Sequence, residues 1–270
     1  MKRSSTVILV ESAVMVALAS VLSMFKLVEM PYGGSVTFAS MLPIIALSYR
    51  HGAKVGLGAG LVFAIVQQLS GLKYISYFTT PMSIIALILL DYILAFVFVG
   101  LGGIFRGKVK GQANAATLGA LTVCLIRYLC HVISGCTIWA GLSIPTSAAL
   151  IYSLGYNATY MLPETVVLVA ATYYLTSAVD LTSKDIKRIS HTEDAGNALY
   201  YYISGGALLI GVIADTVLIA PHTQNPESGS FDLSYLSEVS WIWVGVVSAV
   251  CVLVALVSLI LGKVKAKRAE

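Results

Sequence analysis

The sequence predicts an all-α fold, a polytopic membrane protein built as a bundle of helices. Of its 270 residues, 58% are hydrophobic and only 11% are charged, whereas a soluble domain carries roughly 25% charged residues. The mean hydropathy is +0.87, and the apolar runs approach the roughly 20 residues that a helix needs to cross a bilayer. Because backbone groups in lipid must be hydrogen-bonded internally, long continuous apolar runs favour helices over a barrel, whose segments are shorter and alternate.

Each apolar run is expected to form one helix, and together they suggest about eight spans. The second and third runs are short. Gly56, Gly58 and Gly60 lie in the third but lack the spacing and the strand–helix setting of a dinucleotide loop, so we interpret them as packing residues. No P-loop motif occurs in the sequence, which excludes ATP hydrolysis by that route. The expected helices cover about residues 6–25, 38–49, 55–70, 81–103, 114–135, 147–177, 198–220 and 240–262.

The basic residues predict the orientation of the chain. If Lys2 and Arg3 are cytoplasmic, 14 of the 17 lysines and arginines fall in cytoplasmic loops and tails, and only Lys26 and Lys73 fall outside. This asymmetry follows the positive-inside rule and predicts that both termini are cytoplasmic in a multi-pass protein of the cell membrane. The net charge of +4 is thereby explained by the topology of the chain in the lipid bilayer, and nucleic acid is not implied as a partner.

One charged stretch divides the sequence. Residues 179–197 contain the longest run of charged and polar side chains. We therefore expect a membrane core over residues 1–178, a cytoplasmic linker over 179–197, and a transmembrane hairpin with a basic cytoplasmic tail over 198–270. The loop at 221–239 has no lysine or arginine, which favours the outer face.

Polar side chains gather within the hydrocarbon between Arg127 and Glu164. A charge at the centre of a membrane helix costs about 2.5–3.5 kcal/mol, so a cluster of polar groups indicates a cavity, a partner or a substrate. Arg127 and His131 share a helix face because they are four residues apart. Trp139 is either an interface residue or a surface on which a flat heterocycle stacks.

Asp91 is an isolated acid in a strongly apolar segment. An unpaired carboxylate there would neutralise or find a partner. It is either the counter-ion of a cationic ligand or the partner of Arg127 within the bundle. Its neighbour Tyr92 is a hydrogen-bonding wall or an interface anchor.

The helix that follows carries a second polar face. Asn157, Tyr160 and Glu164 stand at i, i+3 and i+7, whereas Tyr152 is about 140° away from Asn157 on an ideal helix. Tyr152 and Asn157 are therefore expected to meet at one site only if Gly155 permits a bend or if that region is a loop. The glycine-containing turn at 31–37 is either an ordinary connection or a loop that gates a site from outside.

Other patterns carry little chemistry. Cys124, Cys130 and Cys136 are spaced by six, which is no metal-ligand spacing, so neither a metal nor a cofactor is predicted. Ser134 and His131 could touch at i, i+3, but an intramembrane hydrolase would also need an orienting group and an oxyanion site. Small residues four apart let helices approach closely, and this spacing occurs on the first helix at Ala13 and Ala17.

Several separated motifs together resemble one family. The segments MPYGGSVTFASMLP (30–43), LLDYILAF (89–96), RYLCHVISGCTIW (127–139) and IYSLGYNATYMLPE (151–164) are similar to the thiamine-specific substrate-binding subunit, or S component, of energy-coupling factor (ECF) transporters. The similarity covers about residues 1–178. Family members often carry glutamate where this sequence has Asp91.

The resemblance implies a non-enzymatic function, ATP-driven uptake of thiamine through high-affinity binding. It implies a six-helix core that docks through Ala13 and Ala17 onto a transmembrane coupling subunit served by two ATPase subunits. The C-terminal hairpin is an addition to that core. A related vitamin or a pyrimidine precursor is the alternative ligand. The substrate-binding positions implied by the matching motifs are Asp91, Tyr92, His131, Trp139, Tyr152 and Asn157.

Overall fold

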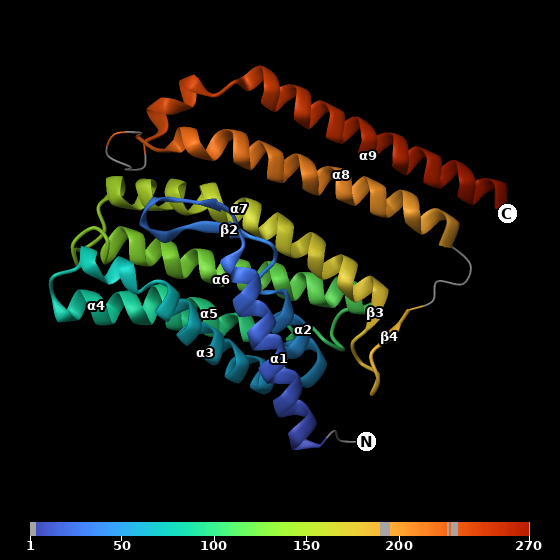
Figure 1. Cartoon of the computed structure of the whole chain (residues 1–270), viewed down its shortest axis with the longest axis horizontal. Helices are drawn as coiled ribbons and strands as arrows, with labels where there is room; N and C mark the ends of the chain where they lie inside the picture. Colours follow the sequence, from blue (N-terminus) through green and yellow to red (C-terminus); the bar gives the residue numbers. More distant parts are fainter. Residues whose placement is uncertain (1–3, 190–194, 226, 228–231, 270) are drawn as a thin grey trace. The chain divides into compact units, whose positions relative to one another are not determined.

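The computed structural model describes residues 4–189, 195–225, 227 and 232–269 (Figure 1). The chain divides into two compact units, Met1–Arg188 and Ile189–Glu270. The described part is mostly helical, as the composition predicted. The helical segments of the first unit are α1 (Ser5–Met24), α2 (Leu42–His51), α3 (Ala53–Ser70), η2 (Leu72–Tyr77), the consecutive α4 (Pro81–Leu87), η3 (Ile88–Leu94), α5 (Ala95–Val97) and η4 (Phe98–Leu101), α6 (Gln112–Thr137) and α7 (Ser147–Ala178).

Six helices in the described ranges are long and apolar enough to cross a membrane. The other two expected spans correspond to α2 and α7. Helix α2 has ten residues and covers only about 15 Å at 1.5 Å per residue, so it cannot cross a bilayer alone. Helix α7 is long enough to cross, with 32 residues, but polar side chains interrupt its apolar ones. The six are Ser5–Met24, Ala53–Ser70, Pro81–Leu101, Gln112–Thr137, Tyr202–Thr223 and Trp241–Gly262.

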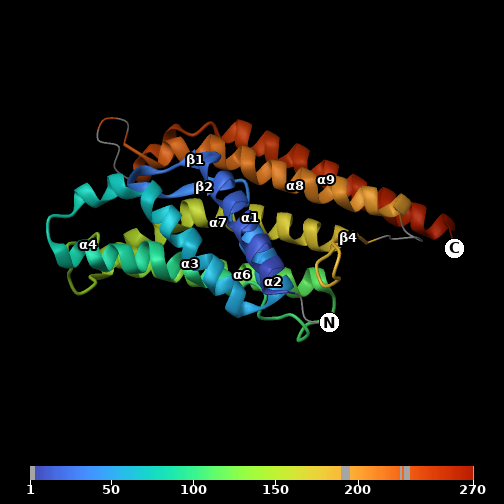
Figure 2. The ribbon, with the colours of Figure 1, turned by 60° about the horizontal axis from the view of Figure 1, so that its bottom comes forward.

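Small residues bring the helices of the first unit together. Helices α6 and α7 run side by side in both views (Figures 1 and 2). A Cβ atom on Gly60 would lie 2.7 Å from the carbonyl oxygen of Val97, and a Cβ on Gly56 would collide with the backbone of Gly100. Gly56 and Gly60 are thus packing residues, as predicted, whereas Gly58 has no atom within 4 Å of its Cβ position.

A short antiparallel hairpin connects α1 to α2. Strand β1 (Lys26–Glu29) pairs with β2 (Ser35–Thr37), with Glu29 opposite Ser35 and an irregularity between Lys26 and Val28. Between the strands lies a 3₁₀ turn, η1 (Pro31–Gly33). The predicted turn at 31–37 is therefore part of a structured hairpin.

The opposite end of the first unit is fastened by Arg50. Its Nε and Nη2 donate to the Glu11 carboxylate at 2.8 and 3.1 Å, and its guanidinium also donates to the carbonyl oxygens of Leu181, Ser183 and Lys184. These contacts join α1, α2 and the segment after α7, where β3 (Val179–Asp180) pairs with β4 (Lys187–Arg188). A buried arginine with so many acceptors is compensated.

The second unit is a helical hairpin. Helix α8 (Ala195–Ile219) leads through η5 (Ala220–Thr223) and η6 (Leu233–Glu238) to α9 (Trp241–Ala269). A Cβ on Gly211 would lie 3.0 Å from the Cβ of Cys251, and Ser248 Oγ donates to Asp215 Oδ2 at 2.6 Å. Helix α8 begins at residue 195 rather than 198, and residues 190–194 of the predicted linker lie outside the described residues.

Candidate binding cavity

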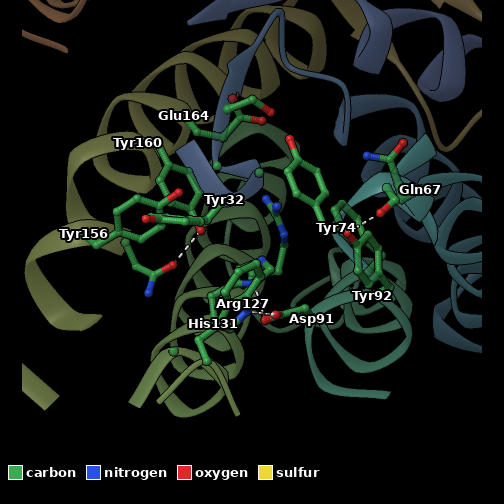
Figure 3. A pocket seen from close by; sticks show the side chains of 18 of the residues that line it. Tyr32, Gln67, Tyr74, Asp91, Tyr92, Arg127, His131, Tyr156, Tyr160 and Glu164 are labelled. Atoms are coloured by element: carbon green, nitrogen blue, oxygen red, sulfur yellow. Dashed lines mark hydrogen bonds and ion pairs between the residues drawn. The ribbon is translucent and has the colours of Figure 1, made fainter. Parts of the chain in front are cut away.

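A cavity of about 650 Å³ lies within the first unit. This is the size of a site for a small organic molecule. Figure 3 shows polar and aromatic side chains pointing into it from several elements. Its walls come from the β1–β2 hairpin, α3, η2, η3, α6, the loop after α6 and α7. The six positions that the resemblance implied all line it: Asp91, Tyr92, His131, Trp139, Tyr152 and Asn157.

Asp91 is the centre of a hydrogen-bond network. Its Oδ1 lies 3.0 Å from His131 Nδ1, and its Oδ2 accepts from Ser134 Oγ at 2.7 Å and from Trp139 Nε1 at 3.0 Å. The expected alternative, a pair with Arg127, is not the arrangement found. His131 and Ser134, one helical turn apart on α6, reach the carboxylate instead, and the chain after α6 folds back to bring Trp139.

The backbone around Asp91 departs from α-helical geometry. Ile88–Leu94 forms a π-helical stretch within the segment Pro81–Leu101. Such stretches occur frequently at functional sites because they displace side chains from the regular helical register. Asp91 and its neighbour Tyr92 both reach the cavity wall, where the Tyr92 hydroxyl lies 3.4 Å from the carbonyl oxygen of Gly71.

Aromatic rings from distant parts of the chain meet at the mouth of the cavity. The ring of Tyr32, at the tip of the hairpin, lies 5.6 Å from that of Trp139, 5.9 Å from Tyr77 and 6.2 Å from Tyr156. Phe78 packs edge-on against Trp139 at 4.9 Å. These separations are typical of edge-to-face aromatic pairs, so a flat ligand would find stacking surfaces on several sides.

Tyr32 adopts an unusual backbone conformation. Its φ of 62° lies in the left-handed region, which is costly for a residue with a side chain. The adjacent Gly33 has φ 104°, which glycine adopts without a steric penalty. The strained turn directs Tyr32 at the cavity mouth, where it contacts the aromatic cluster.

Helix α7 supplies a ladder of polar groups. Asn157 Nδ2 donates to Ser153 O at 2.8 Å, and Tyr160 Oη donates to Asn157 Oδ1 at 2.6 Å. The rings of Tyr152 and Tyr156 stack in parallel at 6.4 Å. The region around Gly155 is not a loop, because Ser147–Ala178 is one continuous helix, and Tyr152 and Asn157 both line the cavity.

The reason is side-chain length. Asn157 sits deep in the cavity, whereas Tyr152 is half-exposed at its mouth and meets the site through its ring rather than its backbone. Two residues about 140° apart on one helix can therefore border the same wide cavity.

Glu164 connects the hairpin to α7. The backbone N–H of Thr37 donates to its Oε2 at 2.5 Å, and Thr37 Oγ1 lies 2.8 Å from its Oε1. Nearby, a Cβ on Gly34 would lie 2.5 Å from the Tyr160 ring. The hairpin thus lies against α7 at Gly34, where a side chain would overlap the ring of Tyr160.

Several cavity residues were not among the predicted substrate-binding positions. Tyr32, Gln67, Tyr74 and Tyr156 line the cavity but stand in segments that a sequence pattern assigns to turns or ordinary membrane helix. Tyrosines near helix ends have an alternative explanation as interface residues. The glycine-containing turn that could gate a site was the one signal that pointed to Tyr32.

The Ser134–His131 pair does not form a hydrolytic site. Both side chains are bonded to the same carboxylate, and no hydrogen bond joins the Ser134 hydroxyl to the imidazole among the described contacts. Ala13 and Ala17 lie elsewhere, on an exposed face of α1 away from the cavity lining.

A polar cavity closed by aromatic rings within a membrane bundle defines a membrane protein that binds a small molecule. Comparison with known proteins gives the particular family. The sequence profile of the thiamine transporter protein family (Thia_YuaJ) matches residues 9–183, so this chain belongs to that family. The family consists of transporters rather than enzymes, as the sequence predicted.

Two relatives show the extent of the similarity. The thiamine transporter ThiT of Bacillus subtilis (strain 168) is 37% identical, over 59% of this chain and 84% of the relative. A solved structure of ThiT from Listeria monocytogenes matches with a TM-score of 0.51 and 24% identity, covering 63% of this chain and 93% of that one. The latter supports the fold alone.

Proposed function

We propose that this chain takes up thiamine as the substrate-specific S component of an ECF transporter, with the described cavity as its binding site. Family membership supports the transported compound. The observation that carries the site is the network around Asp91, which places a carboxylate, an imidazole and an indole on one cavity wall.

The ligand's chemistry fits these groups. Thiamine joins a flat aminopyrimidine to a cationic thiazolium. The carboxylate of Asp91 attracts the cation and accepts from the amino group, while Trp139 and the tyrosines at the mouth offer stacking faces. His131 and Asn157 hydrogen-bond the polar edges of the pyrimidine, Tyr152 stacks near the mouth, and Tyr92 forms a side wall.

Binding to the purified chain tests this proposal. Thiamine should quench or shift Trp139 fluorescence, and Trp139→Phe should abolish most of the change, whereas Trp243→Phe, in the second unit, should not. If thiamine produces no saturable change and a related pyrimidine or vitamin co-purifies by mass spectrometry, the alternative ligand replaces thiamine.

The partners are part of the same proposal. An exposed small-residue face on α1, formed by Ala13 and Ala17, suits close approach of a coupling-subunit helix, with two ATPase subunits supplying the energy. Ala13→Leu with Ala17→Leu should prevent co-purification with the coupling subunit and leave thiamine binding intact. Loss of both properties would place these alanines in folding instead.

The proposed orientation puts the cavity on the outer face and both termini in the cytoplasm. Lys26 and Lys73 meet at Glu29 beside the cavity mouth, while Arg50 and Arg106 meet at the other end. This distribution agrees with the positive-inside rule. Labelling of single cysteines placed at residues 73 and 54 by a membrane-impermeant reagent in whole cells should modify the first and spare the second.

A further inference from the structure

The cavity contains more charge than one vitamin cation requires. Among its described lining residues, the side chains able to carry charge are Lys26, Asp91, Arg127, His131 and Glu164. Lys26 lies at the mouth, where it and Lys73 both contact Glu29 Oε1, at 2.8 and 3.2 Å. Solvent screens these exposed charges, so the buried charges have the larger effect on what the cavity accepts.

Asp91 is held by hydrogen bonds rather than by a lysine or an arginine. Its partners are the hydroxyl of Ser134, the indole N–H of Trp139 and the imidazole of His131. The carboxylate therefore remains available as the counter-ion of a cationic ligand.

Arg127 forms no ion pair among the residues that the structure describes. The side chain is buried, its Nε has no acceptor among the described residues, and Nη1 faces the weakly accepting Met41 Sδ at 3.0 Å. The guanidinium carbon lies 4.6 Å from the centre of the Phe96 ring. Neither contact neutralises a buried cation, and an uncompensated one is expensive.

Glu164 is the matching anion. It is buried, and its hydrogen bonds come from Thr37, which has no charge. Arg127 is a buried cation that lines the same cavity. Figure 3 shows the two side chains reaching the same cavity from α6 and α7. In a medium of low dielectric constant, such charges interact over distances longer than a salt bridge.

We infer that Arg127 and Glu164 neutralise each other inside the cavity, which leaves Asp91 as the acid that faces a ligand and makes the cavity favour a cation over its neutral isostere. This inference rests on the proposed function and adds to it. Arg127 and Glu164 are then specificity-determining residues that need not touch the thiazolium.

The test compares two ligands in four proteins. The ligands are thiamine and its neutral isostere, in which carbon replaces the charged ring nitrogen. The proteins are the full-length chain, Glu164→Gln, Arg127→Met and the double variant. All measurements are made at one pH. The quantity compared is the ratio of the two affinities, because a merely structural defect weakens both ligands and leaves the ratio unchanged.

Each variant has a defined expectation. Glu164→Gln exposes the Arg127 charge and should lower the preference for thiamine by about tenfold or more. Arg127→Met should raise it, because Glu164 adds a second negative charge. The double variant should return to within about threefold of the unmodified chain.

Three results would overturn the inference. An unchanged ratio in Glu164→Gln would mean that Glu164 carries no charge. Failure of the double variant to restore the ratio would mean that the two residues act independently. If the single variants do not fold, the double variant alone decides, since a ratio different from that of the unmodified chain contradicts neutralisation. Absence of any thiamine binding by the unmodified chain would instead overturn the proposed function itself.

Discussion

The indole of Trp139 donates to the carboxylate of Asp91 across 3.0 Å, although the two residues are 48 positions apart. The loop after α6 is therefore tied to the π-helical stretch that carries Asp91. One side chain of this pair offers a stacking face and the other a charge. A change at Asp91 should thus disturb both.

Asp91→Asn is expected to weaken thiamine binding by about a hundredfold. The substitution removes the negative charge. It also places an amide N–H₂ where one carboxylate oxygen had accepted hydrogen bonds, so donor would face donor. A hydrogen bond to a charged group is worth about 1.5–3 kcal/mol, and 1.4 kcal/mol corresponds to tenfold in affinity. Titration calorimetry measures the loss. Asp91→Glu keeps the charge and should retain most of the affinity, and equal losses in both variants would contradict an electrostatic role.

Gly34→Ala should impair binding through packing alone. The new Cβ would lie 2.5 Å from the ring of Tyr160, so the hairpin must move away from α7. Overpacking of this kind costs about 1–3 kcal/mol. The temperature of thermal unfolding and the affinity for thiamine should both decrease. Gly155→Ala is the matched control, because no atom lies within 4 Å of its Cβ position; an equal effect there would argue against the proposed contact.

Arg50→Met should destabilise the first unit without altering the cavity. The change removes the Arg50 donor from Glu11, which keeps its contact with His51, and from the carbonyl oxygens of Leu181, Ser183 and Lys184. Breaking a fully buried ion pair costs about 3–5 kcal/mol, and the partly exposed Glu11 makes this an upper bound. The melting temperature in detergent should fall. Lys54→Met, which removes an exposed charge from the neighbouring helix, should leave it nearly unchanged.

Acid should loosen the hairpin through Glu29. The Lys26 ammonium, followed by Lys73, holds the pKa of the Glu29 carboxyl below its ordinary value of 4.5. A lowered pKa in the folded state means that the contact stabilises fully above pH 4.5 and is lost as the pH falls through the lower value. The effect should be small, because these groups are largely solvated.

The measurement is the rate of thiamine dissociation between pH 6 and pH 3. The rate should rise at the acid end in the unmodified chain. Glu29→Gln should have the faster rate throughout and lose this part of the pH dependence. A parallel acid response in both proteins would assign the effect to another group.

A chain ending at Arg188 should still bind thiamine. The residues that line the cavity lie between Ser23 and Glu164, the family similarity ends at residue 183, and the first unit is compact by itself. The affinity should remain within about threefold of that of the full chain, since independent parts contribute additively. Loss of binding with retained helicity would show that the second unit supports the site.

The helices could be predicted because their signal is repeated many times. Each apolar run reflects the same physical requirement: a membrane helix needs apolar side chains to face the lipid, while its backbone polar groups bond to one another. Asp91 and His131 could be identified because ionisable groups in hydrocarbon are rare and costly. Thr146 caps α7, and its Oγ1 accepts from the N–H of Ala149 at 3.1 Å.

The partners of those residues could not be predicted in the same way. The π-helical register at Ile88–Leu94 depends on packing. No local sequence pattern therefore indicates that Asp91 accepts a hydrogen bond from Trp139 rather than pairing with Arg127. Tyr32 and Tyr156 enter the site through a strained turn and a ring cluster. Such convergence depends on tertiary structure, which hydrophobic periodicity does not encode.

Helices α8 and α9 of the C-terminal hairpin pack closely against each other where Gly211 faces Cys251. The Ser248–Asp215 hydrogen bond likewise joins α8 to α9. A helix pair that supplies its own close packing and its own polar partner can enter a membrane as a finished module.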